Sequence, residues 1–300
     1  MKKRNAIIMA AGTSSRFVPL SAECPKGLVE VKGEVLIERQ IRQLIGAGIT
    51  DISLVVGYKA DMFDYLRGKY GVKIVLNEDF ARYNNTSSLI RVIDKLNNTF
   101  VCSSDNYFPE NVFLKDSEDS YYSTLYAEGD TNEYCVTANA DDYITDVRVG
   151  GRDAWYMVGH VFFNQEFSEA FRRIMIEEYK KDTTKQGYWE DLYIRYIDQL
   201  PKMKINRYKK GEIQEFDSLD ELRMFDSSYI ENTRSSVIKT ICKTLEIQES
   251  SVHGFKNIKH NGNYLHFQFK VGDITYEYDD RTAISIEKRY EHRYNSCSKT

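Results

Sequence analysis

The sequence predicts an α/β protein: a Rossmann-like, doubly wound, mostly parallel sheet with a β-rich insert, followed by a small α+β C-terminal domain. Short apolar runs alternate with helical patterns over the first hundred residues, which is typical of a parallel sheet covered by helices. Beyond residue 121, strand-like segments follow one another through turns rich in Asp, Asn and Gly. Polar residues then gather over residues 226–236, so we expect two domains, 1–229 and 230–300.

The alternating region contains four apolar runs, each short enough to be a buried strand, and three segments with apolar residues at helical spacing. The strands are expected at residues 6–9, 52–56, 72–76 and 99–102, and the helices at 34–47, 62–70 and 88–96. Ligands of such sheets bind beyond the carboxyl ends of the strands. Gly12, Gly57 and Asp105 each follow a strand, so we expect them at one edge of the sheet.

The rest of the chain follows a different pattern, with more strands and fewer helices. Before the boundary, strands are expected at residues 123–126, 134–137, 144–149, 157–163, 204–208 and 212–216, and helices at 166–181, 190–199 and 219–225. Ser218 is the predicted N-cap of the last of these helices. After the boundary, a helix is expected at 237–245 and strands at 255–259, 264–271 and 274–278.

Composition excludes several classes of protein. The net charge of −4 and the isoelectric point near 5.9 are unlike the basic surface of a nucleic-acid-binding protein. No apolar run approaches the roughly 20 residues of a membrane-spanning helix, and we expect no membrane insertion. Five scattered cysteines without a C-x-x-C pair favour free thiols over disulfides or a zinc site. The first apolar run is too short for a signal peptide, so we expect a cytoplasmic protein.

The segment after the first strand has the residue types that bind a triphosphate. Six small residues, whose backbone N–H groups could approach an anion, are followed by a guanidinium and, further on, by an ammonium group. In order they are Ala10, Ala11, Gly12, Thr13, Ser14, Ser15, Arg16 and Lys26. The alternative is a surface turn with two unrelated cations. The ordered combination, with prolines at 19 and 25, favours a nucleotide site.

At these positions the chain resembles the sugar-phosphate nucleotidylyltransferase superfamily, whose signature is G-x-G-x-R-x-x-P followed by P-K. Gly12 and Arg16 match the signature, Ser14 replaces its second glycine, and Lys26 follows Pro25. The serine variant looks most like the bacterial CTP:phosphocholine cytidylyltransferase branch, and the resemblance covers about residues 5–226. It implies that CTP and phosphocholine give CDP-choline and pyrophosphate with Mg²⁺ as cofactor. It also implies a nucleotidyltransferase domain at 1–229.

Carboxylates lie at the ends of two of the predicted strands. Asp105 comes after the fourth strand, where the superfamily carries its main metal ligand, and oxygen ligands suit Mg²⁺. Glu215 and Asp217 alternate around Phe216 and would face one side of a strand, and they match the superfamily pattern E-x-D-[ST]. The alternatives are that Asp105 is an ordinary turn residue and that Asp217 or Ser218 only caps the helix.

A polar run before the third helix is a candidate base-binding loop. Residues 83–89 offer amides and hydroxyls, including Asn85 and Ser88, which suit the donor and acceptor edge of cytosine. The run also resembles the cytidylyltransferase branch. A plain helix-capping loop is the alternative.

Aromatic and acidic residues predict how the second substrate is held. A quaternary ammonium group binds to aromatic faces and nearby carboxylates. Five residues supply both kinds of group: Trp155, Tyr188, Trp189, Glu190 and Asp191. Because the chain has 22 tyrosines, core packing is the alternative for these aromatics. His160 lies in an apolar strand, and we expect it in the core.

These assignments define a mechanism and leave the acceptor, the presence of activity and the oligomeric state open. Arg16 and the loop amides would hold the β- and γ-phosphates, Lys26 would neutralise charge at the α-phosphate, and Asp105 with Asp217 would hold Mg²⁺. Phosphoethanolamine, 2-aminoethylphosphonate or a sugar 1-phosphate could replace phosphocholine. The chain could instead be an inactive nucleotide-binding regulator, and a homodimer is left open.

The tail weakly resembles the opening of a choline kinase amino-terminal lobe, but residues 276–280 offer no phosphate-binding lysine. A small accessory or dimerisation domain is therefore expected. Every motif lies before residue 229, so a chain that ends there is expected to keep its activity.

Overall fold

The computed structural model describes residues 3–258, 265–282 and 285–289. Contacts within the chain divide it into two compact units, which are described separately. The first unit contains residues 1–13 and 27–215, and the second contains residues 14–26 and 216–300. The division after Glu215 places residues 14–26, most of the predicted phosphate-binding segment, with the C-terminal part of the chain. The domain boundary between residues 229 and 230 stays a prediction.

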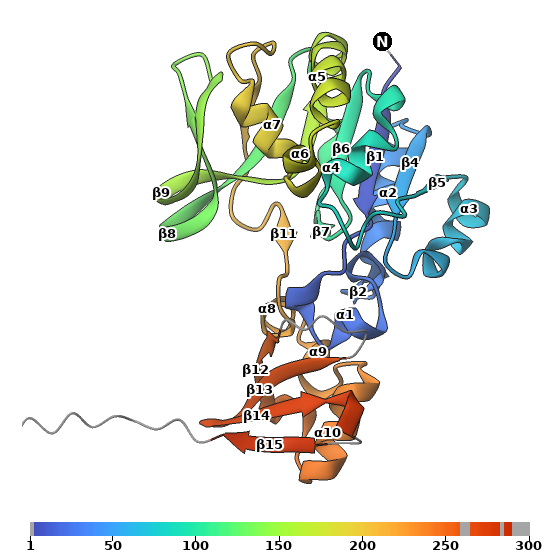
Figure 1. The fold of residues 1–300 in the computed structure, drawn as a ribbon, viewed down its shortest axis with the longest axis vertical. Coiled ribbons are helices and arrows are strands. Elements are labelled where there is room, and N and C mark those ends of the chain that lie inside the picture. Colours follow the sequence, from blue (N-terminus) through green and yellow to red (C-terminus); the bar gives the residue numbers. More distant parts are fainter. Residues whose placement is uncertain (1–2, 259–264, 283–284, 290–300) are drawn as a thin grey trace, which may run out of the picture. The chain divides into compact units, whose positions relative to one another are not determined.

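The first unit is built on a seven-stranded sheet of order β10-β8-β9-β6-β1-β4-β5, of which all strands except β10 are labelled in Figure 1. β1 pairs in parallel with β4 and β6, β4 with β5 and β8 with β10, whereas β9 is antiparallel to both β6 and β8. The strands are β1 (Asn5–Ala10), β4 (Ile52–Val56), β5 (Lys73–Leu76), β6 (Thr99–Ser103), β8 (Tyr121–Ala138), β9 (Ile144–Phe163) and β10 (Lys204–Arg207). The predicted α/β class and mostly parallel sheet are confirmed.

Both faces of this sheet are buried, because successive side chains of a strand point to opposite faces. On β1, Ile8 belongs to the core on one face, with Ile37 and Ile41 of α2 (Leu36–Gly46). Ile7 belongs to the core on the other face, with Phe167 of α5 (Gln165–Glu178) and residues of α7 (Trp189–Arg195). This arrangement is the doubly wound sheet that the alternating sequence predicts.

The remaining helices of the first unit are short. Residues 62–70, expected as one helix, form a 3₁₀ turn (Ala60–Phe63) and α3 (Tyr65–Tyr70). Residues 88–96 likewise divide into α4 (Thr86–Ile90) and a 3₁₀ turn (Ile93–Lys95). The other elements are α6 (Asp182–Gln186), β2 (Glu30–Val31) paired with β3 (Glu34–Val35), and β7 (Asn106–Tyr107) paired with β11 (Gln214–Glu215).

The insert is a long bent hairpin of two continuous strands, β8 and β9, where the sequence predicts four separate ones. Cys135 pairs with Arg148 and also with Tyr156, so the far end of the hairpin folds back on its middle. Gly129 and Gly150 lie at φ 82° and 80°, which glycine adopts without the strain of a side chain. The predicted turns near Gly129 and Gly150 are thus bends within paired strands, whereas residues 139–143 form the predicted turn between β8 and β9.

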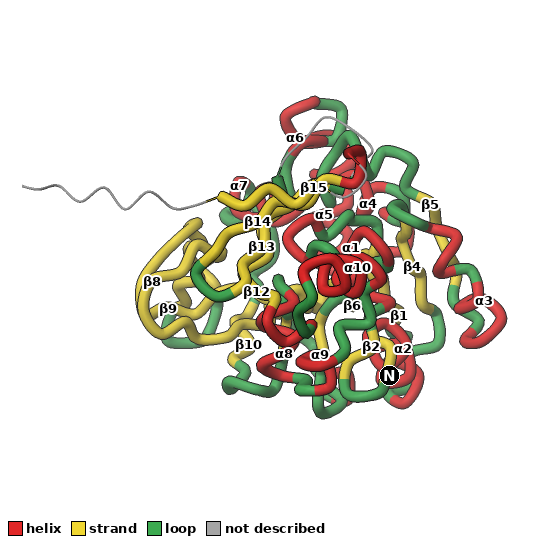
Figure 2. Tube along the Cα trace, turned by 90° about the horizontal axis from the view of Figure 1, so that it is seen from below, coloured by secondary structure: helices red, strands yellow, loops and turns green. Residues whose placement is uncertain are grey.

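The second unit contains helices and an antiparallel sheet of order β12-β13-β14-β15 (Figure 2). Its strands are β12 (Val252–Asn257), β13 (His266–Val271), β14 (Ile274–Asp279) and β15 (Ser285–Arg289). Its helices are α1 (Leu20–Glu23), α8 (Leu219–Phe225), α9 (Ser228–Glu231) and α10 (Ser236–Leu245). Ser218 Oγ accepts a hydrogen bond from Glu221 N at 3.2 Å, which confirms the predicted cap of α8.

Parts of two predicted strands, residues 259 and 264, lie outside the described residues. Among the described helices, none is long and apolar enough to cross a membrane.

Candidate active site

The first unit places the start of the signature loop at the carboxyl end of β1. Ala10 and Ala11 are buried, whereas Gly12 and Thr13 are exposed. Tyr58 N donates to Ala11 O at 3.1 Å, which ties this end of β1 to the end of β4. A side chain on Gly12 would meet nothing within 4 Å. The backbone at Gly12 and Thr13 therefore faces open space, as approach to an anion requires.

The neighbouring strand end carries Asp105. β6 lies beside β1, with Met9 opposite Ser103, and Ser104 N donates to Met9 O at 3.2 Å. Asp105 follows in the turn between β6 and β7. Because parallel strands end at the same edge, the sheet brings Asp105 to the edge that also carries Gly12. The predicted convergence at this edge is thus present in the fold.

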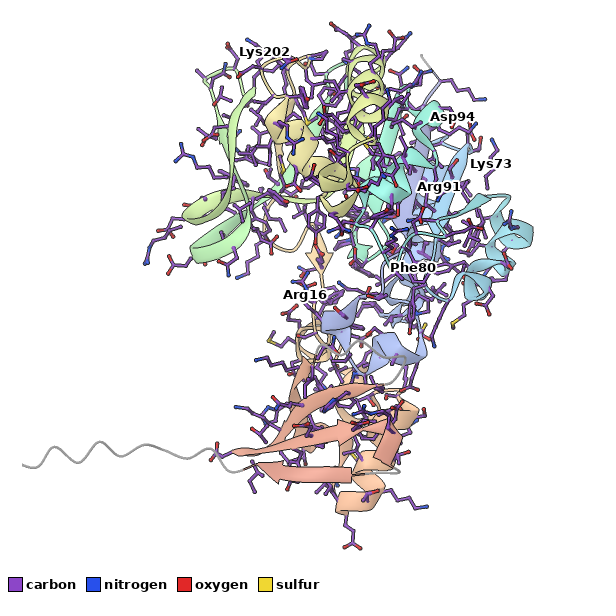
Figure 3. The ribbon with its side chains drawn as sticks, viewed as in Figure 1. Arg16, Lys73, Phe80, Arg91, Asp94 and Lys202 are labelled. Carbon is purple, nitrogen blue, oxygen red and sulfur yellow. The ribbon has the colours of Figure 1, made fainter. Side chains whose placement is uncertain are left out.

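Gly57 and Gly27 allow close packing near this edge. A Cβ on Gly57 would lie 2.6 Å from the Cβ of Phe80, a residue that is labelled in Figure 3. A Cβ on Gly27 would lie 2.9 Å from Ser104 Cβ. Both distances are shorter than packed carbon atoms tolerate, so each glycine leaves room for a neighbouring side chain.

The second unit carries the cations of the signature. Arg16 Nη1 lies 2.6 Å from Asp217 Oδ2, and Lys26 Nζ lies 3.4 Å from Asp217 Oδ1. The Lys26 side chain is only 6% exposed, whereas that of Arg16, labelled in Figure 3, is 73% exposed. Asp217 thus binds both cations that the sequence assigns to the triphosphate.

Ser14 has a backbone conformation that explains the variant signature. Its φ is 50° and its ψ is 47°, in the left-handed region that non-glycine residues seldom adopt. The superfamily pattern has glycine at this position. Ser14 therefore keeps the backbone conformation that a glycine there would adopt easily, and Ser15 begins the 3₁₀ turn Ser15–Phe17.

The three predicted metal ligands are carboxylates, a donor type that fits Mg²⁺. In the first unit, Asn106 Nδ2 donates to Glu215 Oε2 at 3.5 Å, so Glu215 lies beside the residue that follows Asp105. The prediction that Glu215 and Asp217 face one side of a strand requires a strand that continues through Phe216. β11 instead ends at Glu215, so strand geometry does not place the two carboxylates on a shared face. No cluster of three or more His, Cys, Asp or Glu that could hold a metal occurs in the described part of the chain.

The predicted base-binding loop is held by internal hydrogen bonds. Asn85 Oδ1 accepts from Trp189 N at 2.8 Å, and Asn85 Nδ2 donates to Glu190 Oε2 at 3.1 Å. Ser88 Oγ accepts from Asn77 Nδ2 at 3.0 Å and is buried. These contacts favour the capping and packing alternative for both side chains. Their assignment to nucleotide binding stays a prediction.

Tyr188 and Asp191 meet in the first turn of α7. Asp191 Oδ2 accepts from Tyr188 N at 2.8 Å, and Asp191 Oδ1 accepts from Tyr134 OH at 2.9 Å. Tyr188 itself is 46% exposed. Its ring is therefore available to a ligand, while Asp191 fixes the start of the helix.

Trp189 is a core residue of the first unit. It is 1% exposed and belongs to the core of α5 and β9. Its ring stacks on Tyr122 at 5.7 Å and meets Phe163 and Phe171 edge to face at 5.4 and 5.9 Å. These contacts favour the core alternative that the sequence left open for Trp189.

Glu190 is a partly buried acid among polar partners. Burial raises its pKa to about 7, and the charge of Asp191 adds to the rise. Hydrogen bonds from Asn85 Nδ2 and from Tyr122 OH, each 3.1 Å long, act in the opposite direction and lower the pKa.

Trp155 is half-buried, with Tyr126 edge to face at 5.3 Å and the Arg207 guanidinium 5.5 Å from its ring centre. Sequence spacing does not reveal these partners.

The sequence did not single out Glu23 and Tyr122. Glu23 binds the start of α10, and Tyr122 binds Glu190. Their only local signals are a carboxylate inside the signature segment and an aromatic residue in a strand.

His160 is fully buried and stacks on Phe100, which confirms its predicted place in the core. Burial lowers its pKa to about 3.

This chain is similar to known nucleotidyltransferases. Residues 6–123 match the MobA-like NTP transferase domain. The choline-phosphate cytidylyltransferase of Streptococcus pneumoniae is 34% identical over 74% of this chain and 96% of its own length. The 2-aminoethylphosphonate cytidylyltransferase of Lancefieldella rimae is 34% identical over 78% of this chain and 96% of its own.

A solved structure shares the fold. The structure of CTP:phosphocholine cytidylyltransferase from Streptococcus pneumoniae matches with a TM-score of 0.72 at 34% identity, covering 75% of this chain and 99% of that one. About a quarter of this chain thus lies outside the match. On the strength of these relatives, the chain belongs to the cytidylyltransferase family of the nucleotidyltransferases.

Proposed function

We propose that this enzyme transfers the cytidylyl group of CTP to phosphocholine and releases pyrophosphate. The observation that carries the proposal is the edge of the first unit's sheet, where the exposed backbone at Gly12 lies at the end of β1 and Asp105 follows the adjacent β6. Two relatives of this chain are named choline-phosphate cytidylyltransferase. A phosphocholine acceptor would also suit the aromatic and acidic side chains around the start of α7.

The reaction needs positioning and charge neutralisation more than a covalent intermediate. An oxygen of the acceptor phosphate attacks the α-phosphorus, a new P–O bond forms, and the bond between the α-phosphorus and the bridging oxygen breaks as pyrophosphate leaves. The amides near Gly12 and the Arg16 guanidinium would bind the β- and γ-phosphates. Lys26 would neutralise the charge that grows at the α-phosphate.

Mg²⁺ fits the donor chemistry, because Asp105, Asp217 and Glu215 are all oxygen donors. Asp105 and Asp217 would hold the ion, with Glu215 as a further donor, and the ion would supply charge stabilisation to the phosphate oxygens. Arg16 and Lys26 are bound to Asp217 in the protein alone. We expect the triphosphate to compete for these two cations, which would leave Asp217 able to accept a metal ion.

The second candidate acceptor is 2-aminoethylphosphonate, because a relative at the same 34% identity carries that name. The two acceptors differ at the amine, which is quaternary in phosphocholine and a hydrogen-bond donor in the phosphonate. Exposed Tyr188 offers an aromatic face to the former. The carboxylates of Glu190 and Asp191 could serve either.

The test is a pyrophosphate-release assay in which four nucleoside triphosphates are crossed with four acceptors. The acceptors are phosphocholine, phosphoethanolamine, 2-aminoethylphosphonate and glucose 1-phosphate, each with Mg²⁺. We expect the highest kcat/KM for CTP with phosphocholine. A preference for the phosphonate or the sugar would assign the acceptor differently, and CTP binding without turnover on any acceptor would support the inactive regulator.

A further inference from the structure

The side chain of Glu23 links the segment that carries Arg16 and Lys26 to the part of the chain that follows residue 229, in addition to the ion pairs of both cations with Asp217. Residues 14–26 belong to the second unit together with residues 216–300. Glu23 ends α1, seven residues after Arg16 and three before Lys26. Its carboxylate binds the start of α10, in the part of the chain that follows all the predicted motifs.

The carboxylate of Glu23 accepts four hydrogen bonds from three consecutive residues. Ser236 N and Ser236 Oγ donate to Oε2 at 2.9 and 2.7 Å, and Val237 N donates to Oε1 at 3.3 Å. Ser235 Oγ also donates to Oε1. Burial opposes ionisation of Glu23, but these bonds outweigh it and lower the pKa of the carboxyl group.

This contact suits the electrostatics of α10. The first backbone N–H groups of a helix lack partners within it, and a negative charge there is stabilising. α10 has no acidic residue in its own first turn, and its N-cap Ser235 satisfies only Ile238 N, at 3.1 Å. Glu23, 212 positions earlier than Ser235, therefore supplies the missing charge and the missing acceptors.

The helix α10, whose start binds the Glu23 carboxylate, is itself fixed within the tail. Ile238 and Ile241 of α10 are fully buried. Thr233 N, just before the helix, donates to Glu249 Oε2 at 2.6 Å. Arg223 of α8 donates to Glu249 O at 2.8 Å. The carboxylate of Glu23 is thus anchored to a hydrogen-bonded frame and not to a single loop.

We propose that Glu23 is a positioning residue, and that the start of α10 holds residues 14–26 in the conformation in which Arg16 and Lys26 bind the triphosphate. The inference rests on the proposed function, because it assigns those cations to CTP. It makes the tail a structural part of the nucleotide site. It also runs against the expectation that a chain ending near Tyr229 would keep its activity.

The test uses two variants of the full chain that break the contact from opposite sides. Glu23→Ala removes the acceptor. Ser236→Pro removes two of its donors while keeping a residue that is favoured at the first position of a helix, and extended Ser235 suits a following proline. The matched control is Glu231→Ala, because Glu231 accepts only a 3.4 Å bond from Ser250 within the tail among the bonds described for it.

Both test variants should weaken CTP binding with Mg²⁺, measured by calorimetry without acceptor, by about tenfold, as expected for the loss of charged hydrogen bonds that order a binding segment. Hydrogen exchange of residues 14–26 should rise in both, and phosphocholine KM should stay unchanged. The double variant should be no worse than the single ones, because both remove one contact. Glu231→Ala should change none of these values.

The outcomes separate this inference from the proposed function. If the wild type binds CTP and both folded variants bind it equally well, the positioning role is wrong and the proposed function stands. If exchange rises over the whole tail as well as over residues 14–26, Glu23 stabilises the unit in general and the specific role is wrong. If the wild type neither binds nor turns over CTP, the proposed function falls, and the inference with it.

Discussion

The two compact units hold the residues that are predicted to be catalytic by different means. In the first unit, Gly12 and Asp105 are placed by the backbone of a parallel sheet, through bonds such as Ser104 N to Met9 O at 3.2 Å. In the second unit, Arg16 and Lys26 are held by the side chain of Asp217. A backbone ladder tolerates exchange of a single side chain, whereas an ion-paired cluster does not.

This difference has a consequence for mutants. A substitution at the sheet edge should remove chemistry and leave stability unchanged, because the backbone still fixes the position. A substitution in the ion-paired cluster should change both the charge available for catalysis and the conformation of its neighbours. Variants of the two units can therefore be told apart by measuring turnover and melting temperature on the same protein.

The largest effect is expected for Asp105→Asn, which keeps the size of the side chain and removes its charge. Turnover with Mg²⁺ should fall by about 10³-fold or more, because metal-assisted charge stabilisation is worth several kcal/mol. The melting temperature should not change. Asp94→Asn is the matched control, since Asp94 pairs only with its neighbour Lys95 at 2.8 Å among the described ion pairs. Activity within a few-fold of wild type would remove Asp105 from the metal site.

Trp189→Ala should have the next largest effect, on stability. Removing a fully buried indole costs about 3–5 kcal/mol of unfolding free energy, and activity toward phosphocholine and phosphoethanolamine should fall equally. Denaturant unfolding and both acceptors are measured on one preparation. Tyr188→Ala is the comparison: its ring is 46% exposed, so it should unfold like wild type and lose about fivefold in kcat/KM for phosphocholine alone. A selective loss of phosphocholine by Trp189→Ala would return the indole to the acceptor site.

Lys26→Met tests the ion-paired cluster. The side chain is 6% exposed and lies 3.4 Å from Asp217, so methionine keeps the buried stem and removes the charge. We expect kcat to fall about 10²-fold while KM for CTP changes much less, because the charge is needed most in the transition state. Lys73→Met, at a surface pair with Asp51, is the control. If KM alone changes, Lys26 is a binding residue and the assigned role is wrong.

The parts of the fold that depend on local chemistry could be predicted. β4 and α8 have the predicted bounds, because an apolar run between turn residues and a Ser N-cap are local signals. The edge that joins Gly12 to Asp105 follows from the rule that parallel strands end together. Even the replacement of a signature glycine by Ser14 is compatible with the left-handed backbone found there.

The parts that depend on long-range contacts could not. Trp189 is buried by Phe163 and Phe171, which the sequence places in other elements. Residues 14–26 belong to the C-terminal unit, where Glu23 binds Ser235, 212 positions further along the chain. No periodicity encodes such a pair. The shape of the hairpin β8–β9 also depends on contacts distant in sequence, because a second pairing of Cys135, with Tyr156, folds the hairpin back on itself.

The smallest expected effect is a pH dependence of stability that is caused by Glu190. Burial raises its pKa to about 7 from an ordinary value of 4.5, so the folded protein binds a proton between these values that the unfolded chain has lost. The stability contributed by this proton is fully present below about pH 4.5 and is lost as the pH rises through 7. Glu190→Gln should therefore remove a decline in melting temperature between pH 5 and 8 that is present in the wild type.

The same titration should appear in acceptor binding if the Glu190 carboxylate supports the cationic group. Below about pH 7 the group is neutral, so KM for phosphocholine should fall about fivefold as the pH rises through 7, the size of roughly 1 kcal/mol of ion pairing. The phosphate groups of both substrates titrate as well, but their titration is the same in assays of wild type and of Glu190→Gln. The variant measured in the same buffers is therefore the control. A KM that depends on pH in the same way for both proteins would confine Glu190 to packing beside Tyr122 and Asn85. If wild type and Glu190→Gln differ in the pH dependence of KM for phosphocholine but not for CTP, the acceptor binds beside the start of α7. That helix belongs to the unit that positions its residues by packing and backbone.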